Sequence, residues 1–150
     1  MNEVNTRQFR ALLRTVSATD EARQMRAYVQ HGTVSTYDHC VRVAAVSYLL
    51  NRRLGLGADE RSLVRGAFLH DFYLYDWHDP TQHARLHGLH HPALAAENAE
   101  RYYTLNDKER NIIRSHMWPL TITAVPACRE AVIVCIADKW CSLVETLLYR

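Results

Sequence analysis

The chain has 150 residues, 48% of them hydrophobic and 23% charged, which predicts one ordinary soluble domain over residues 1–150. Eighteen basic and sixteen acidic residues give a net charge of +2, too balanced to indicate a nucleic-acid or membrane partner. The polar start lacks the apolar segment of a signal peptide, and no apolar run approaches the ~20 residues that span a bilayer. We therefore expect a cytoplasmic protein whose four cysteines, none in a CxxC pair, are reduced.

Apolar residues recur at helical spacing along most of the chain and predict an all-α fold, a compact bundle of about seven helices. The expected helices cover residues 5–16, 20–32, 36–53, 60–77, 92–103, 107–116 and 126–150. The expected N-caps and first-turn prolines are Asp20, Thr36, Asp59, Asn106, Pro92 and Pro126. No alternating apolar segment bounded by hairpin turns is present, so we expect no sheet.

Three of these helices carry a histidine or an aspartate on their apolar face. Asp138 directly follows the apolar run AVIVCIA, and His70 and Asp71 lie on apolar stripes of the helix over 60–77. His39 lies on the apolar face of the helix over 36–53. A single such histidine is usually a hydrogen-bonded core residue, and a buried carboxylate must be paired or bound to a metal. Imidazole and carboxylate groups from three helices together indicate a centre for a divalent ion such as iron, manganese, cobalt, nickel or zinc.

Two further histidines extend this pattern. His91 precedes the helix over 92–103 and His116 ends the helix over 107–116. The resulting order is His, His-Asp, His, His, Asp, with 20–31 residues between successive elements. This order resembles that of the HD-domain metal-dependent phosphohydrolase superfamily, and the resemblance covers residues 36–145, the motif-bearing core of the chain. The Gly-Tyr-Pro signature of the cyclic-dinucleotide branch is absent after His70 and Asp71.

The resemblance implies a ligand set, a reaction and an alternative reaction. The residues that match the family's core ligands and the extra ligands of its dinuclear branch are His39, His70, Asp71, Asp138, His91 and His116. Asp71 matches the carboxylate that bridges two ions. The implied function is hydrolysis of a phosphomonoester or nucleotide by a metal-bridging hydroxide. The alternative is a di-iron oxygenase built on the same ligands, and a third possibility is a metal-stabilised binding domain without turnover.

Other polar residues are candidates for contact with a small phosphorylated substrate. Arg42 lies one turn from His39, and Lys139 follows Asp138, so each can place a cation near a phosphate. His87 is our candidate for the group that protonates the leaving group. His91 is preferred to His90 as a ligand because the family often has His-Pro, and Pro92 follows His91. The oligomeric state stays open.

One electrostatic expectation follows from the proximity of two carboxylates. Asp71 and Asp138 would lie next to each other in the metal-free protein, and like charges at short range raise a carboxyl pKa. We therefore expect a raised pKa for Asp71, and an Asp71→Asn substitution that leaves the metal-free protein as stable as before or more stable.

Overall fold

The computed structural model describes residues 3–75 and 87–148, with side chains for residues 5–75 and 90–148. The elements are α1 (Glu3–Ser17), α2 (Asp20–Gln24), the 3₁₀-helix η1 (Met25–Ala27), β1 (Val29–His31), β2 (Val34–Ser35), α3 (Thr36–Leu54), α4 (Glu60–Leu69), α5 (His87–Tyr102), α6 (Asp107–Ser115) and α7 (Arg129–Leu148). The expected all-α fold is confirmed, apart from one small hairpin. No helix in the described ranges combines the length and apolarity needed to cross a membrane.

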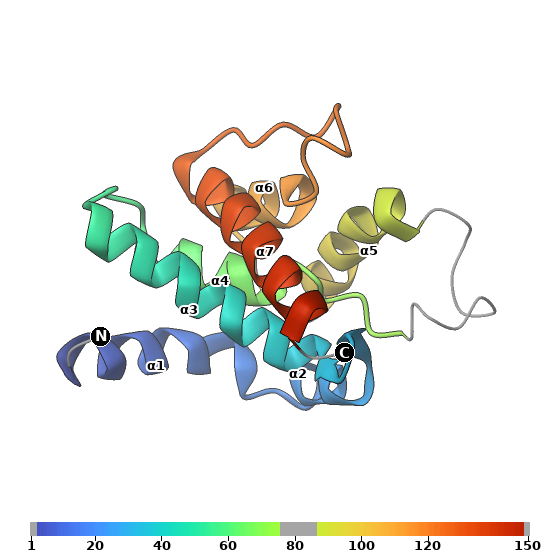
Figure 1. Ribbon diagram of the computed structural model, residues 1–150, viewed down its shortest axis with the longest axis horizontal. Helices are drawn as coiled ribbons and strands as arrows, with labels where there is room; N and C mark the ends of the chain where they lie inside the picture. The colour runs from blue at the N-terminus through green and yellow to red at the C-terminus, as the bar shows by residue number, and fades with distance from the viewer. Residues whose placement is uncertain (1–2, 76–86, 149–150) are drawn as a thin grey trace.

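Helix α4 lies at the centre of the bundle and contacts α1, α3, α5, α6 and α7 (Figure 1). Every residue from Ser62 to Leu69 is buried. The packing against α6 is especially close at Gly66, where an added Cβ would lie 2.4 Å from Cδ1 of Ile112. Such tight packing leaves little freedom in the relative positions of α4 and α6.

A buried ion pair also links these two helices. Arg65 Nε donates to Glu109 Oε1 at 2.6 Å, and Arg65 Nη2 donates to the Thr104 carbonyl at 3.2 Å. Glu109 belongs to the capping box of α6, because its carboxylate accepts from the Asn106 backbone N–H while the Asn106 side chain accepts from the Glu109 N–H. The start of α6 is thus fixed against the middle of α4.

The region expected as one helix over residues 20–32 differs from the prediction. Helix α2 is capped by Thr19 instead of Asp20 and ends at Gln24, and an antiparallel hairpin follows η1. Val29 pairs with Ser35 and His31 with Val34, and Gly32 adopts a φ of 57° in the turn. Strands of three and two residues are too short to show alternation in the sequence, which is why no sheet was expected.

Other helix limits also differ from the predictions. Helix α3 is capped by Ser35 rather than Thr36, whereas Asp59 and Asn106 cap α4 and α6 as predicted. Helix α4 ends at Leu69 instead of residue 77, and Leu74, with a φ of 57°, departs from helical geometry beyond it. Helix α5 begins five residues before Pro92, and α7 begins at Arg129 rather than Pro126.

Candidate metal centre

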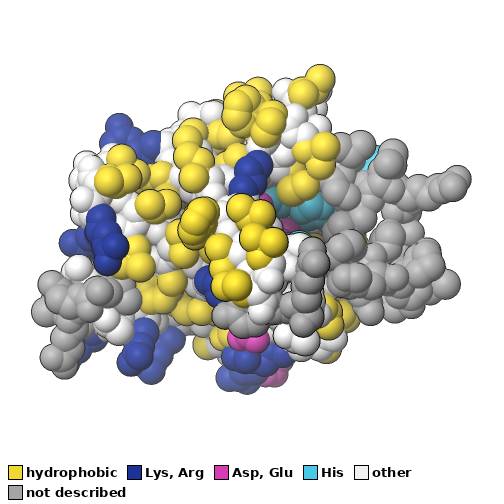
Figure 2. Space-filling model, viewed as in Figure 1, with side chains coloured by type: hydrophobic (Ala, Val, Ile, Leu, Met, Phe, Trp, Pro, Cys, Tyr) yellow, Lys and Arg dark blue, Asp and Glu magenta, His cyan; other side chains and the backbone are white. Residues whose placement is uncertain are grey.

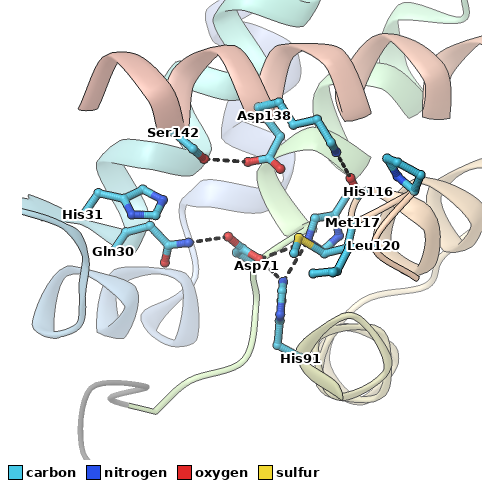
Figure 3. Close-up of a pocket in the computed structure, with 11 residues that line it drawn as sticks. Gln30, His31, Asp71, His91, His116, Met117, Leu120, Asp138 and Ser142 are labelled. Carbon is cyan, nitrogen blue, oxygen red and sulfur yellow. Dashed lines mark hydrogen bonds and ion pairs between the residues drawn. The ribbon is translucent and has the colours of Figure 1, made fainter. Parts of the chain in front are cut away.

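Five helices deliver the predicted ligands to one point in the bundle. His39 comes from α3, His91 from α5 and Asp138 from α7. His70 directly follows the last residue of α4, and His116 directly follows the last residue of α6. The six side chains brought together are His39, His70, Asp71, His91, His116 and Asp138, and all six are buried. Figure 3 shows Asp71 between Asp138 on one side and His91 on the other.

The two carboxylate oxygens of Asp71 face different pairs of histidines. Its Oδ2 lies 3.3 Å from His70 Nε2 and 3.8 Å from His39 Nε2. Its Oδ1 lies 3.2 Å from His91 Nε2 and 3.4 Å from His116 Nε2. One carboxylate thus separates two groups of imidazole nitrogens, which is the arrangement expected of a ligand shared by two cations.

Asp138 completes the first of these groups. Its Oδ1 lies 3.2 Å from His39 Nε2 and 3.6 Å from His70 Nε2, and Ser142 Oγ donates to the same oxygen at 3.3 Å. The first group therefore contains two imidazoles and two carboxylates, with Asp71 as the shared member. These are nitrogen and oxygen donors of the kind that borderline divalent ions take.

Hydrogen bonds on the outer side of three rings fix which nitrogen faces the centre. His70 Nδ1 donates to the Ala67 carbonyl at 2.7 Å, and His116 Nδ1 donates to the Ile113 carbonyl at 2.8 Å. His39 Nδ1 donates to Glu145 Oε2 at 2.7 Å. Because Nδ1 carries the proton in each ring, Nε2 is the nitrogen left to bind a metal, as in metal sites with outer hydrogen bonds.

Two buried ligand atoms of this centre, Nε2 of His70 and Oδ1 of Asp71, lack a hydrogen-bond partner among the described residues. His91 Nε2 and His116 Nε2 lie only 2.8 Å apart, so a proton between them or a cation beside them must offset the repulsion of two lone pairs. Buried polar atoms are seldom left unsatisfied in folded proteins. The residues present therefore fit divalent metal ions.

The charges of the metal-free centre are strongly coupled. Burial alone would raise the pKa of Asp71, but the positive charge of His70 and the interactions with His91 and His116 together outweigh burial and hold that pKa well below its usual value. The pKa of Asp138 is also lowered, because hydrogen bonds from His39 and His70 outweigh the effect of burial. The expectation of a raised Asp71 pKa was wrong, because the surrounding imidazoles outweigh the other carboxylate.

The pKa values of the histidines diverge. Burial alone would lower the pKa of His39, but its hydrogen bonds to Asp138 and Glu145 outweigh burial and raise the pKa to about 9. The negative charge of Asp71 likewise raises the pKa of His70 well above its usual value, against the effect of burial. Burial lowers the pKa of His116. Metal binding at His39 must therefore displace a proton.

Sequence reasoning missed two residues that contact these ligands. Glu145 is buried on α7, and its two carboxylate oxygens accept from His39 Nδ1 and from Arg42 Nη1, each at 2.7 Å. Its position seven residues after Asp138 places both on one helix face, and this spacing was a usable signal. Gln30 donates to Asp71 Oδ2 at 2.7 Å while its carbonyl oxygen accepts from Tyr73 OH. Gln30 reaches the centre only through the hairpin, which the sequence did not indicate.

A cavity of about 720 Å³ opens onto the centre (Figure 3). Polar residues at the cavity include Gln30, His31, Lys139 and Ser142, and an apolar wall is formed by Met117, Pro119 and Leu120. The volume lies in the range of pockets that hold small organic ligands.

The remaining predicted residues differ in their placement. Lys139 lines the cavity, and its Nζ donates to the His116 carbonyl at 3.0 Å. The guanidinium of Arg42 binds Glu145 Oε1 at 2.7 Å, and Arg42 is not among the described lining residues of the cavity. Its contact with substrate stays a prediction. His91 points to Asp71, whereas His90 is exposed. The side chain of His87 lies outside the described residues.

The comparisons with known proteins agree with this geometry. A family model for the HD domain matches residues 36–142, which is more than half of the chain. The chain therefore belongs to the HD-domain family, which is part of a superfamily of metal-dependent hydrolases. The resemblance predicted from the sequence is confirmed. No curated protein and no solved structure gives a significant match.

Proposed function

We propose that this chain is a phosphohydrolase that binds two divalent metal ions and cleaves a phosphomonoester or nucleotide. The observation that carries the proposal is the division of the histidines between the two oxygens of Asp71. Six ligand side chains exceed the four that one tetrahedral ion needs. His39, His70 and Asp138 would hold one ion, His91 and His116 the other, with Asp71 shared. Iron, manganese, cobalt, nickel and zinc all suit this donor set.

The chain's own residues would bind the substrate beside the ions. When bound, the ions supply a water of lowered pKa and neutralise charge that develops on a phosphoryl group. Lys139 lines the cavity next to Asp138, so its ammonium group can pair with a phosphate oxygen. The wall of Met117, Pro119 and Leu120 offers contact to an apolar part of the substrate. His87 as the proton donor to the leaving group, and a cytoplasmic location, stay predictions.

A hydrogen-bond network also holds Asp71 in place from the side of the hairpin. Gln30 donates to Asp71 Oδ2, and its own carbonyl oxygen accepts from Thr36 Oγ1 at 3.3 Å as well as from Tyr73. This network fixes the amide so that its NH₂ group faces Asp71, while the neighbouring imidazoles hold the pKa of that carboxyl low. An ionised Asp71 is the form able to bind two cations.

The proposal is tested by hydrolysis of p-nitrophenyl phosphate after the protein is loaded with manganese or iron, in air and under argon. Metal-dependent hydrolysis at equal rates in both atmospheres, with two ions per chain, is the expected result. Oxygen uptake by the iron-loaded protein without hydrolysis would assign the chain to the oxygenase alternative. A chain that binds no divalent metal would refute both reactions.

The Asp71→Asn variant is the matched test of the shared ligand, and Glu130→Gln is its control. Glu130 is a buried carboxylate on α7 that binds Lys108 Nζ at 2.8 Å and the Asp59 N–H at 2.7 Å, away from the centre. Asp71→Asn should lose both ions and nearly all hydrolysis, whereas Glu130→Gln should retain them. Equal metal content in the two variants would contradict the role of Asp71.

A further inference from the structure

The outward face of α7 carries a continuous apolar stripe. Its members are Val132, Ile136, Trp140, Leu143 and Leu147, and all five are exposed. At 100° per residue these positions fall within an arc of about 80°, and at 1.5 Å per residue they extend over about 22 Å. From Ile136 onward the intervals of four, three and four residues match the seam along which helices pair in coiled coils.

Few charges interrupt this face. Helix α7 contains five charged residues, and Glu130, Asp138 and Glu145 among them are buried. Only Arg129 and Lys139 are left to the solvent side, and Lys139 is held over the His116 carbonyl. Figure 2 shows hydrophobic side chains gathered over α7 and the connection between α6 and α7, with few charged groups among them. Solvated helices normally carry a charged outer face.

The segment between α6 and α7 enlarges this surface. Leu120, Ile122 and Val125 are exposed on it, and it lies against α7 because Cys135 Sγ donates to the Trp118 carbonyl at 3.1 Å. Apart from Leu120, which also lines the cavity, seven large apolar side chains of this surface are each more than two-fifths exposed. Together they present on the order of several hundred Å², comparable with the ~800 Å² per partner of a standard stable interface and at the upper end of what a monomer usually exposes.

We propose that two copies of the chain pair through this surface, α7 against α7, in a two-fold symmetric dimer. A two-fold interface uses the same patch on both subunits, so the patch must be compatible with itself. The five members of the stripe carry no charge, which meets that condition. Of the two exposed charges of α7, Arg129 lies beyond the start of the stripe and donates to the Leu56 carbonyl, and Lys139 lies beside the stripe and donates to the His116 carbonyl. The stripe and the connecting segment together supply the area that such a dimer needs.

The dimer is tested by sedimentation velocity and by light scattering after size exclusion, on the full chain at 1–100 µM. Wild type should have twice the mass of one chain. Leu147→Glu and Leu143→Glu should be monomers, with the dimer dissociation constant raised more than about 100-fold, because like charges would face each other across the axis. Leu54→Glu is the matched control, since Leu54 is 66% exposed on α3 and Leu147 is 61% exposed on α7.

Circular dichroism checks that each variant is folded. A cross-linking assay tests the dimer independently of the glutamate variants. Trp140→Cys lies at the middle of the stripe and should form a covalent dimer with a short bis-maleimide, beyond the background of the native cysteines. A monomeric wild type, an oligomer larger than a dimer, a dimer that survives in folded Leu147→Glu, or equal dissociation by Leu54→Glu would each overturn the proposal. The readout is mass, so its outcome is separate from that of the hydrolysis assay.

Discussion

Replacing Glu145 with glutamine should weaken metal binding at His39 without removing a ligand. Glutamine keeps an oxygen that can accept from His39 Nδ1 but removes the negative charge. Glu145 is fully buried and contacts His39 at 2.7 Å, so its charge acts on the ring at short range. An anionic partner on the outer nitrogen makes the inner nitrogen a stronger ligand for a cation. The substitution should therefore lower affinity for the ion held by His39.

The size of the effect can be estimated from the charge that His39 carries without metal. Its pKa rises from 6.5 to about 9, which corresponds to about 3 kcal/mol in favour of a positive ring. Burial opposes this rise, and Asp138 and Glu145 share the favourable contribution. A share of about 1.5 to 3 kcal/mol for the Glu145 charge agrees with a charged hydrogen bond and predicts about a 10- to 100-fold loss of metal affinity.

Calorimetric titration of the metal-free protein with manganese or zinc measures this loss. In Glu145→Gln one of two binding events should weaken, while the event at His91 and His116 keeps its affinity. Glu130→Gln is the control, because it removes the charge of another buried glutamate of the same helix. The reasoning is refuted if Glu145→Gln binds both ions as wild type does, or if Glu130→Gln weakens the same event equally.

Three further predictions concern the centre itself. Metal-free Asp71→Asn should be less stable than metal-free wild type at pH 7 by about 3–5 kcal/mol, because the substitution breaks a buried ion pair. A melting temperature equal to or above that of wild type would contradict the lowered pKa of Asp71. Metal-free wild type should lose about 3 kcal/mol of stability as pH rises from 6.5 through 9, because the raised pKa of His39 contributes stability that is fully present only below pH 6.5. Urea unfolding with a chelator at pH 6.5 and 9.5 measures this loss, and equal free energies of unfolding at the two pH values would contradict the prediction. His91→Ala should reduce metal content to about one ion per chain by elemental analysis whereas His90→Ala should not, and the reverse pattern would move the ligand to His90.

The sequence predicted the site best where a charged or polar side chain lies on an apolar helix face that must be buried. A carboxylate such as Asp138 within an apolar helix is costly unless it is paired, so it marks a site without knowledge of the fold. Asp59 and Asn106 were also predictable as caps, because N-capping depends only on local hydrogen bonds. Those features need no information about distant parts of the chain.

The parts that were not predicted depend on tertiary contacts. Gln30 reaches Asp71 from a hairpin of five strand residues, and no local pattern of that length distinguishes a strand from a turn. The end of α4 at Leu69 is set by the path that the chain takes after Asp71, where Asn98 of α5 binds the Tyr73 carbonyl at 2.9 Å. Periodicity alone could not indicate that contact.

The absence of one methyl group at Gly66 has a consequence for the spacing of the ligands. The Cβ of an alanine there would meet the side chain of Ile112, and Ile112 lies one helical turn before His116 on the same face of α6. To accommodate the methyl group, the Ile112 side chain would have to turn away, and α6 would have to shift slightly from α4 because the Cβ of Ile112 is also only 3.1 Å away. His116, which directly follows α6, would move with it, while Asp71, two residues after the end of α4, would keep its place. Gly66 therefore sets the distance between Asp71 and His116, although it contacts neither.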